Sequence, residues 1–116
     1  MKIREIADLL DAKVYCGQEL LDRDVHSGCG CDMMSDVLAY VKDQAVLLTG
    51  LVNPQVIRTA EMMDIICIVL VRGKEPTDAM IELAQERSIV FLSTEQRMFG
   101  ACGILYSAGL SEGGKA

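Results

Sequence analysis

Residues 65–73 read IICIVLVRG, an unbroken apolar run that ends at a charged residue and a glycine. The run is rich in β-branched residues and has the length of a strand. Continuous apolar strands of this kind are buried on both faces. Such strands occur in parallel sheets that helices cover on each side. The run is also far too short to span a bilayer, which excludes a membrane anchor here.

Further apolar runs, which predict strands, lie at residues 25–31, 45–50 and 89–92, and a segment of helical character follows each strand. From Val25 onward the order is therefore strand, helix, strand, helix, strand, helix, strand, helix. This alternation predicts a compact layered α/β domain with a mainly parallel four-stranded sheet and flanking helices. The residues before Val25 predict a short amphipathic helix, a short strand at 13–17 and a polar turn.

Start signals mark two of these helices. Asn53 is suited to the N-cap and Pro54 to the first helical position, which is a strong start signal. Ser93 and Gln96 stand at capping-box spacing, which predicts that the last helix begins at Ser93.

The chain has 116 residues, of which 51% are hydrophobic and 24% charged, and its net charge is −6. We expect one globular domain over residues 1–110 and a flexible tail over 111–116. The negative charge argues against nucleic acid and anionic membranes as partners, because both are bound through clustered basic residues. Charges every few residues near the N-terminus argue against a signal peptide, which predicts a cytoplasmic protein.

Two glycines and two cysteines alternate in SGCGC, residues 27–31. Gly28 and Gly30 match the start of a dinucleotide-binding G-x-G-x-x-G loop, but Met33 occupies the third position and no acidic residue follows the next strand. No phosphate-binding P-loop is present either. We interpret the glycines as a sharp turn from strand to helix, where Asp32 or Ser35 can accept from free backbone N–H groups.

Cys29 and Cys31 are one residue apart, so in a strand both thiols face the same side. A zinc or iron–sulfur site needs three or four ligands, and the other cysteines form no second pair. We therefore expect no metal, no cofactor and buried thiols. The alternative is a small thiol-dependent redox or metal-binding accessory protein that uses Cys29 and Cys31.

In a parallel sheet the segments that leave the strands converge at one edge, which is where open α/β sheets bind ligands. We expect a small anionic ligand at this edge, bound without being transformed, because helix N-termini there favour anions and Arg72 offers a forked donor. The alternative is an edge that only caps its helices or is covered by a partner chain. The candidate binding residues are Asp32, Ser35, Thr49, Asn53, Arg72, Gly73, Ser93 and Thr94.

The high apolar content, with seven methionines, also predicts self-association, most simply as a two-fold homodimer. Two segments could supply the contact surface. One is the glycine-broken last helix, residues 95–106, and the other is the methionine-bearing helix after Asp32.

Residues 25–106 resemble the DRTGG domain, which is similar to the N-terminal domain of HPr kinase/phosphorylase. The resemblance rests on CDMMSDVL, with Cys31 where serine is usual, and on VRGKEP. The second motif keeps Gly73 and Pro76 but has Val71 and Arg72 in place of Thr-Gly, and the strand that ends at Ser93 and Thr94 is typical.

Such domains occur alone or appended to phosphotransacetylases and CBS-domain proteins. The resemblance therefore implies a regulatory or accessory module that binds a ligand or a partner protein and is not an enzyme. The ATP-binding loop of HPr kinase lies in its other domain, and no such loop is present in this sequence, so kinase activity is not expected.

Overall fold

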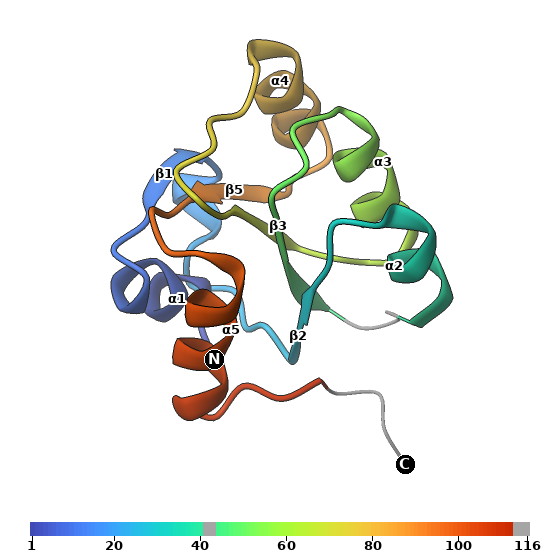
Figure 1. Cartoon of the computed structure of the whole chain (residues 1–116). Helices are drawn as coiled ribbons and strands as arrows, with labels where there is room; N and C mark the ends of the chain where they lie inside the picture. Colours follow the sequence, from blue (N-terminus) through green and yellow to red (C-terminus); the bar gives the residue numbers. More distant parts are fainter. Residues whose placement is uncertain (41–43, 113–116) are drawn as a thin grey trace.

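The computed structural model describes residues 1–40 and 44–112. A single five-stranded sheet lies between two layers of helices (Figure 1). The strand order is β1 (Lys13–Cys16), β5 (Val90–Ser93), β4 (Cys67–Leu70), β3 (Ala45–Thr49) and β2 (Ser27–Gly30). Strands β2 to β5 are parallel, as predicted, and β1 adds a fifth strand that pairs antiparallel with β5.

The helices that connect the parallel strands all lie on one face of the sheet, and the helices outside this run lie on the other face (Figure 1). The connecting helices are α2 (Met34–Tyr40), α3 (Gln55–Met62) and α4 (Asp78–Glu86). The opposite face carries α1 (Ile3–Leu9) and α5 (Met98–Ser107), and a short 3₁₀ helix, η1 (Gln18–Leu20), follows β1. A helix layer on one side follows from right-handed crossovers between strands that are neighbours in sequence.

The central strand is buried on both faces, as its sequence predicts. No residue of the run 65–71 is more than 4% exposed. Ile68 and Leu70 pack under the connecting helices, whereas Cys67 and Val69 pack under α1 and α5. Burial of each such aliphatic side chain stabilises the fold by about 1.5–3 kcal/mol.

Two hydroxyl groups at the end of β5 fix the neighbouring chain segments. The Ser93 hydroxyl donates to the carbonyl oxygen of Lys74 at 2.6 Å, and the Thr94 hydroxyl donates to that of Leu10 at 2.7 Å. The prediction that a helix begins at Ser93 is therefore wrong. Ser93 is the last residue of β5 and α5 begins at Met98, because the Ser93 side chain is used to hold the loop after β4.

Helix α3 begins at Gln55 with Pro54 as its N-cap residue, one position later than predicted, although the Asn53 side-chain oxygen accepts from the Gln55 N–H at 2.8 Å just before the helix. At the C-terminal end, the Ser111 carbonyl accepts from the Gly28 N–H at 2.9 Å, so the start of the expected tail lies along β2. Residues 113–116 of that tail lie outside the described residues. Within the described parts of the chain, no helix has the length and apolar character needed to cross a membrane.

Candidate functional site

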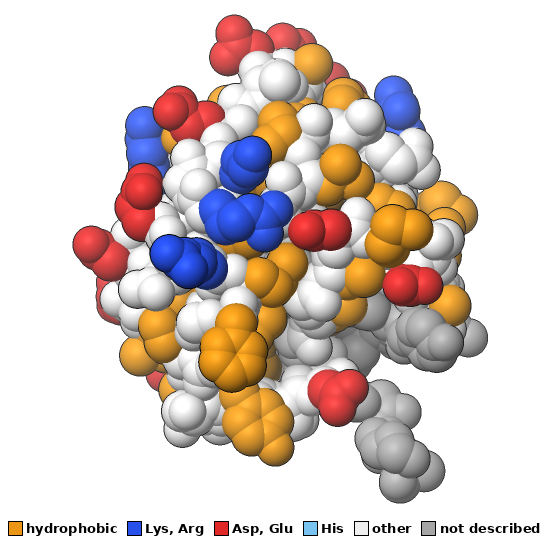
Figure 2. Space-filling view, viewed as in Figure 1, with side chains coloured by type: hydrophobic (Ala, Val, Ile, Leu, Met, Phe, Trp, Pro, Cys, Tyr) orange, Lys and Arg blue, Asp and Glu red, His pale blue; other side chains and the backbone are white. Residues whose placement is uncertain are grey.

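The loops that leave β2, β3, β4 and β5 meet at the carboxyl edge of the sheet. Figure 2 shows several Lys and Arg side chains gathered near the middle of the face that contains these loops, beside acidic and apolar groups. Arg72 and Lys74 follow β4, Arg97 precedes α5, and all three are exposed. This edge therefore carries local positive charge although the whole chain is acidic.

Asp32 connects the loop after β2 to the end of β3 and to Arg72. Its Oδ1 accepts from the Gly50 N–H at 2.7 Å and from the Thr49 hydroxyl at 3.1 Å. Its Oδ2 lies 3.6 Å from Nη2 of Arg72. Three of the candidate residues, Asp32, Thr49 and Arg72, are thus in one contact network.

The charge of the Asp32 carboxylate is stabilised by this network. The N–H of Gly50 is the main reason that the pKa of Asp32 lies below its ordinary value, and Thr49 and Arg72 lower this pKa further. The carboxylate is therefore ionised at neutral pH and, in the absence of a ligand, pairs with the Arg72 guanidinium.

Gly50 is the residue that lets Arg72 lie in this position. A Cβ atom on Gly50 would occupy the place of the Arg72 guanidinium. The glycine that ends the β3 run is visible in the sequence. Its partner is 22 residues further along (72 − 50), however, and only the sheet topology brings the two together. Sequence reasoning therefore missed Gly50 as part of the site.

Arg72 has an uncommon backbone conformation, with φ +62°. The other non-glycine residues with positive φ in the described chain are Asp11, Asp64 and Ser88, and each lies just beyond a helix end, where this conformation is usual. Arg72 instead lies at the end of a strand. Its N–H donates to the Gln96 carbonyl at 2.7 Å, which helps to hold this conformation against a cost of about 1–3 kcal/mol.

Gly73 continues the turn with φ +68°, and its N–H donates to the Thr94 carbonyl at 2.9 Å. A Cβ atom here would lie 2.8 Å from a carboxylate oxygen of Glu95. Gly73 and Ser93 also line a hollow of about 240 Å³ whose other walls are Asp11, Lys13, Tyr15, Glu75 and Glu95. This hollow is mainly acidic, so the positive part of the edge lies on the Arg72 side.

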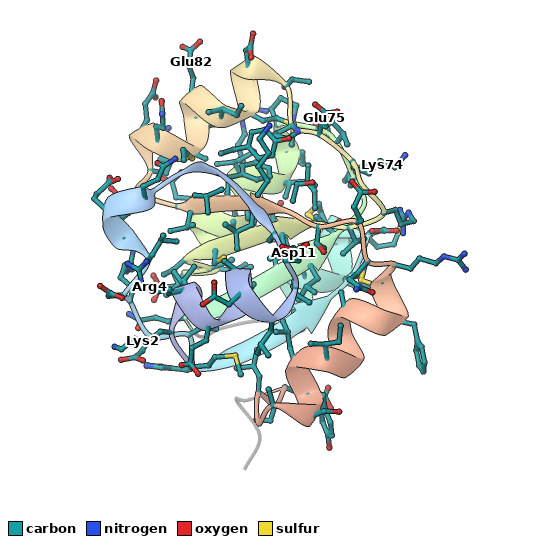
Figure 3. The ribbon with its side chains drawn as sticks, turned by 90° about the vertical axis from the view of Figure 1, so that its left-hand side faces the viewer. Lys2, Arg4, Asp11, Lys74, Glu75 and Glu82 are labelled. Atoms are coloured by element: carbon teal, nitrogen blue, oxygen red, sulfur yellow. The ribbon has the colours of Figure 1, made fainter. Side chains whose placement is uncertain are left out.

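Figure 3 shows Lys74 and Glu75 on the loop after β4, on the other side of the molecule from Lys2 and Arg4. Lys74 is exposed and follows the Arg72–Gly73 turn directly. Its ammonium group thus adds a mobile donor near the rigid guanidinium.

The remaining candidate residues differ in how accessible they are. Thr49, Ser93 and Thr94 are buried, and their hydroxyls already donate to groups of the protein. Ser35 on α2 and Asn53 before α3 are exposed, and the Asn53 side-chain oxygen accepts from the Gln55 N–H at the start of α3. Arg72 and Asp32, with exposed side-chain fractions of 40% and 48%, are the accessible charged groups of the set.

The alternating glycines and cysteines of β2 face opposite layers. A Cβ atom on Gly30 would lie 2.6 Å from Sγ of Cys102 in α5, whereas Cys29 and Cys31 pack with the layer of connecting helices. The glycines therefore allow α5 to approach β2 closely, which is a packing role that the turn interpretation did not foresee.

Burial makes four of the thiols weaker nucleophiles. Burial raises the pKa of Cys29 to about 11, and burial also raises the pKa of Cys16, Cys67 and Cys102. Among residues 1–40 and 44–112 there is no group of three or more His, Cys, Asp or Glu side chains that could hold a metal ion.

Residues 5–108 match the DRTGG domain family. Among solved structures, the chain is similar to the CBS and DRTGG domains of the regulatory region of Clostridium perfringens pyrophosphatase, in complex with the activator diadenosine tetraphosphate. The TM-score is 0.75 at 15% identity, and the match covers 99% of this chain and 52% of that one. This likeness shows the fold, and the chain spans about half of its structural relative. No curated protein matches the chain.

Proposed function

Because this chain belongs to the DRTGG domain family, we propose that it is a non-catalytic regulatory or accessory module that binds a small anionic ligand at the carboxyl edge of its sheet. The ligand class is a nucleotide or another phosphorylated metabolite. The observation that carries the proposal is the position of Arg72, which is held in a left-handed conformation with its guanidinium across Gly50.

Arg72 is suited to an exchangeable anion. At 3.6 Å its contact with Asp32 is a loose ion pair, so a phosphate that offers two oxygens in fork geometry can compete for the guanidinium. Lys74 and Arg97 are exposed on the same edge and add attraction for an anion. The structural relative is the regulatory region of an enzyme in complex with a nucleotide activator, which supports both a regulatory role and an anionic ligand.

Binding without reaction agrees with the chemistry of this edge. The hydroxyls of Thr49, Ser93 and Thr94 are buried and hydrogen-bonded to the protein, so they hold loops in place and are not free to attack a ligand. The raised pKa of Cys29 likewise disfavours Cys29 as the reactive thiol of a redox accessory protein, because a redox thiol reacts as its thiolate.

Chemical-shift mapping of the isotope-labelled protein with ATP, AMP and inorganic phosphate tests the proposal. We expect shifts that cluster at residues 31–32, 50 and 72–74. Arg72→Ala should raise the dissociation constant by roughly tenfold or more, as expected for the loss of a charge-assisted bond.

Arg87→Ala is the matched control. Arg87 has the same exposed side-chain fraction, 40%, and also pairs with a carboxylate, that of Glu61, but it precedes β5 at the opposite edge of the sheet. Its replacement should leave the affinity unchanged. Shifts that cluster near Arg87, turnover of a ligand, or no shift at millimolar ligand would overturn the proposal, and the last result would favour a partner protein on this edge.

We also propose that the module acts as a homodimer. The exposed large apolar side chains Met33, Phe99 and Tyr106, 61–92% accessible, support self-association, because a small monomer seldom exposes so many.

A further inference from the structure

Helix α5 differs from every other helix in the described chain, because none of its ten residues is charged. One face packs on the sheet through Ala101 and Leu105, which are at most 2% exposed. The opposite face exposes Phe99 to 92% and Tyr106 to 72%. A helix that is apolar on all sides is usually covered on all sides, so the outer face of α5 is expected to meet a partner.

The outer face of α5 is symmetric about its centre. The helix runs from Met98 to Ser107, so its midpoint lies between Cys102 and Gly103. Phe99 and Tyr106 lie at equal distances from this midpoint, and a Cβ atom on Gly103 would have no neighbour within 4 Å. A two-fold axis across the helix would therefore bring the backbones of two α5 helices close together at Gly103 and place each Phe99 near Tyr106 of the second copy.

A groove beside Tyr106 can receive the Phe99 ring. It lies between β2 and α5, has a volume of about 170 Å³, and its lining includes Gly30, Leu48, Cys102, Leu105, Tyr106 and Glu112. Most of this lining is apolar. The groove is smaller than pockets that enclose small-molecule ligands, which span about 300–1,000 Å³, so it fits a single aromatic side chain better than a nucleotide.

The charges at the two ends of α5 are complementary in the same arrangement. Arg97 precedes the first residue of the helix, and Glu112 lines the groove beyond its last turn. In an antiparallel pair, Arg97 of one copy approaches the C-terminal end of the other α5, where Glu112 and the free carbonyl groups are negative. The antiparallel helix dipoles are also favourable.

We propose that two copies of this chain pair about a two-fold axis through their α5 helices, with Phe99 of each copy in the groove beside Tyr106 of the other. The surface is self-complementary, as a two-fold interface requires, and an aromatic side chain in an apolar pocket is the usual energetic centre of an interface. The inference rests on the homodimer proposed above; it does not use Arg72, although it shares Arg97 with the proposed anion-binding edge.

The small size of the surface limits the strength expected of the dimer. A stable interface buries about 800 Å² on each partner, whereas the whole chain exposes 6230 Å² and α5 is only about 15 Å long at 1.5 Å per residue. A contact centred on one such helix is smaller than a standard interface, so we expect a dissociation constant on the order of micromolar.

Sedimentation equilibrium from low to high micromolar protein tests the proposal. The wild type should pass from monomer to dimer, and Phe99→Ser should raise the dissociation constant by roughly tenfold or more. Met62→Ser is the matched control, because Met62 is 71% exposed but lies on α3, so this variant should dimerise like the wild type.

Two further variants separate the surface from effects on folding. Gly103→Gln should weaken the dimer and yet raise the melting temperature of the dilute monomer, because glutamine is the better helix former and has room. Arg97→Glu should weaken the dimer, and its combination with Glu112→Arg should restore part of the affinity. A monomeric wild type would overturn both the homodimer and this surface. A Phe99→Ser protein that dimerises as well as the wild type would overturn the surface alone.

Discussion

Replacement of Asp32 by alanine or by asparagine separates the structural role of this carboxylate from its electrostatic role. Asp32→Ala removes the acceptor of the Gly50 N–H at 2.7 Å and of the Thr49 hydroxyl at 3.1 Å. Thr49 is fully buried, so its hydroxyl loses its acceptor where water cannot replace it. At about 1 kcal/mol for each of the two bonds, with a discount because Asp32 is half-exposed, we expect a loss of about 1–2 kcal/mol of unfolding free energy.

Asp32→Asn keeps a side-chain oxygen that can accept both bonds but removes the charge. This variant should lose about 1 kcal/mol or less. Because Asp32 no longer competes for the Arg72 guanidinium, affinity for a phosphate-bearing ligand should rise by up to about fivefold, since an exposed ion pair is worth about 0.2–1 kcal/mol.

Urea unfolding and ligand titration of both variants measure these two effects. The reasoning would be refuted if asparagine destabilised the protein as much as alanine, or if both variants lost ligand affinity. The first result would mean that the charge of Asp32 holds the loops, and the second that Asp32 contacts the ligand directly.

The dependence of stability on pH in the acid range gives an independent check of the direction in which the pKa of Asp32 is shifted. The folded protein lowers the pKa of Asp32, so the contribution of this group is fully present above the unfolded value of about 3.9 and is lost as pH falls through the lower, folded value. The stability advantage of the wild type over Asp32→Ala should therefore be constant near neutral pH and should shrink below about pH 4.

Three further predictions concern packing and the thiols. Gly30→Ala should lower the free energy of unfolding in urea by about 1–3 kcal/mol, because the added methyl forces β2 and α5 apart. Gly103→Ala should instead raise the free energy of unfolding of the dilute monomer by up to about 1 kcal/mol. Equal effects of the two substitutions would contradict the observed packing. Thr94→Val removes the bond to the Leu10 carbonyl and should cost about 1–2 kcal/mol, measured against wild type by thermal unfolding. Cys29 should react slowly with iodoacetamide at neutral pH and faster as pH rises toward its pKa of about 11, and rapid labelling at pH 7 would argue for a redox role.

The fold could be predicted from the sequence because its main determinants are local. The run at residues 65–71 has the composition of a strand buried on both faces, and it is such a strand. The Asn53–Pro54 start signal of α3 also depends only on neighbouring residues, and the helix begins within one residue of the predicted start, at Gln55. The antiparallel pairing of β1 was not predicted, since no local pattern indicates that Lys13 pairs with Ser93, 80 positions later (93 − 13).

The failed prediction at Ser93 shows the limit of local signals. Ser93 and Gln96 have the spacing of a capping box, but the Ser93 hydroxyl bonds to the Lys74 carbonyl and the strand continues through Ser93. A serine that ends a buried strand and a serine that begins a helix can both have a Gln three residues later, so the spacing alone does not distinguish them. The outcome depends on whether a carbonyl from another loop comes within reach, which is a tertiary property.

The candidate site illustrates the same distinction within one group of residues. The sequence places Asp32, Thr49 and Arg72 at one edge because each follows a parallel strand, but their roles depend on geometry that only the folded chain provides. Asp32 was expected to accept from its own helix, whereas its carboxylate accepts from Thr49 and Gly50 and pairs with Arg72. The same carboxylate thus ties two loops together and holds the guanidinium by a loose ion pair, so an anion that displaces Asp32 from Arg72 can leave both loop contacts intact. This arrangement would let a ligand bind and leave without local unfolding, as a reversible regulatory module requires.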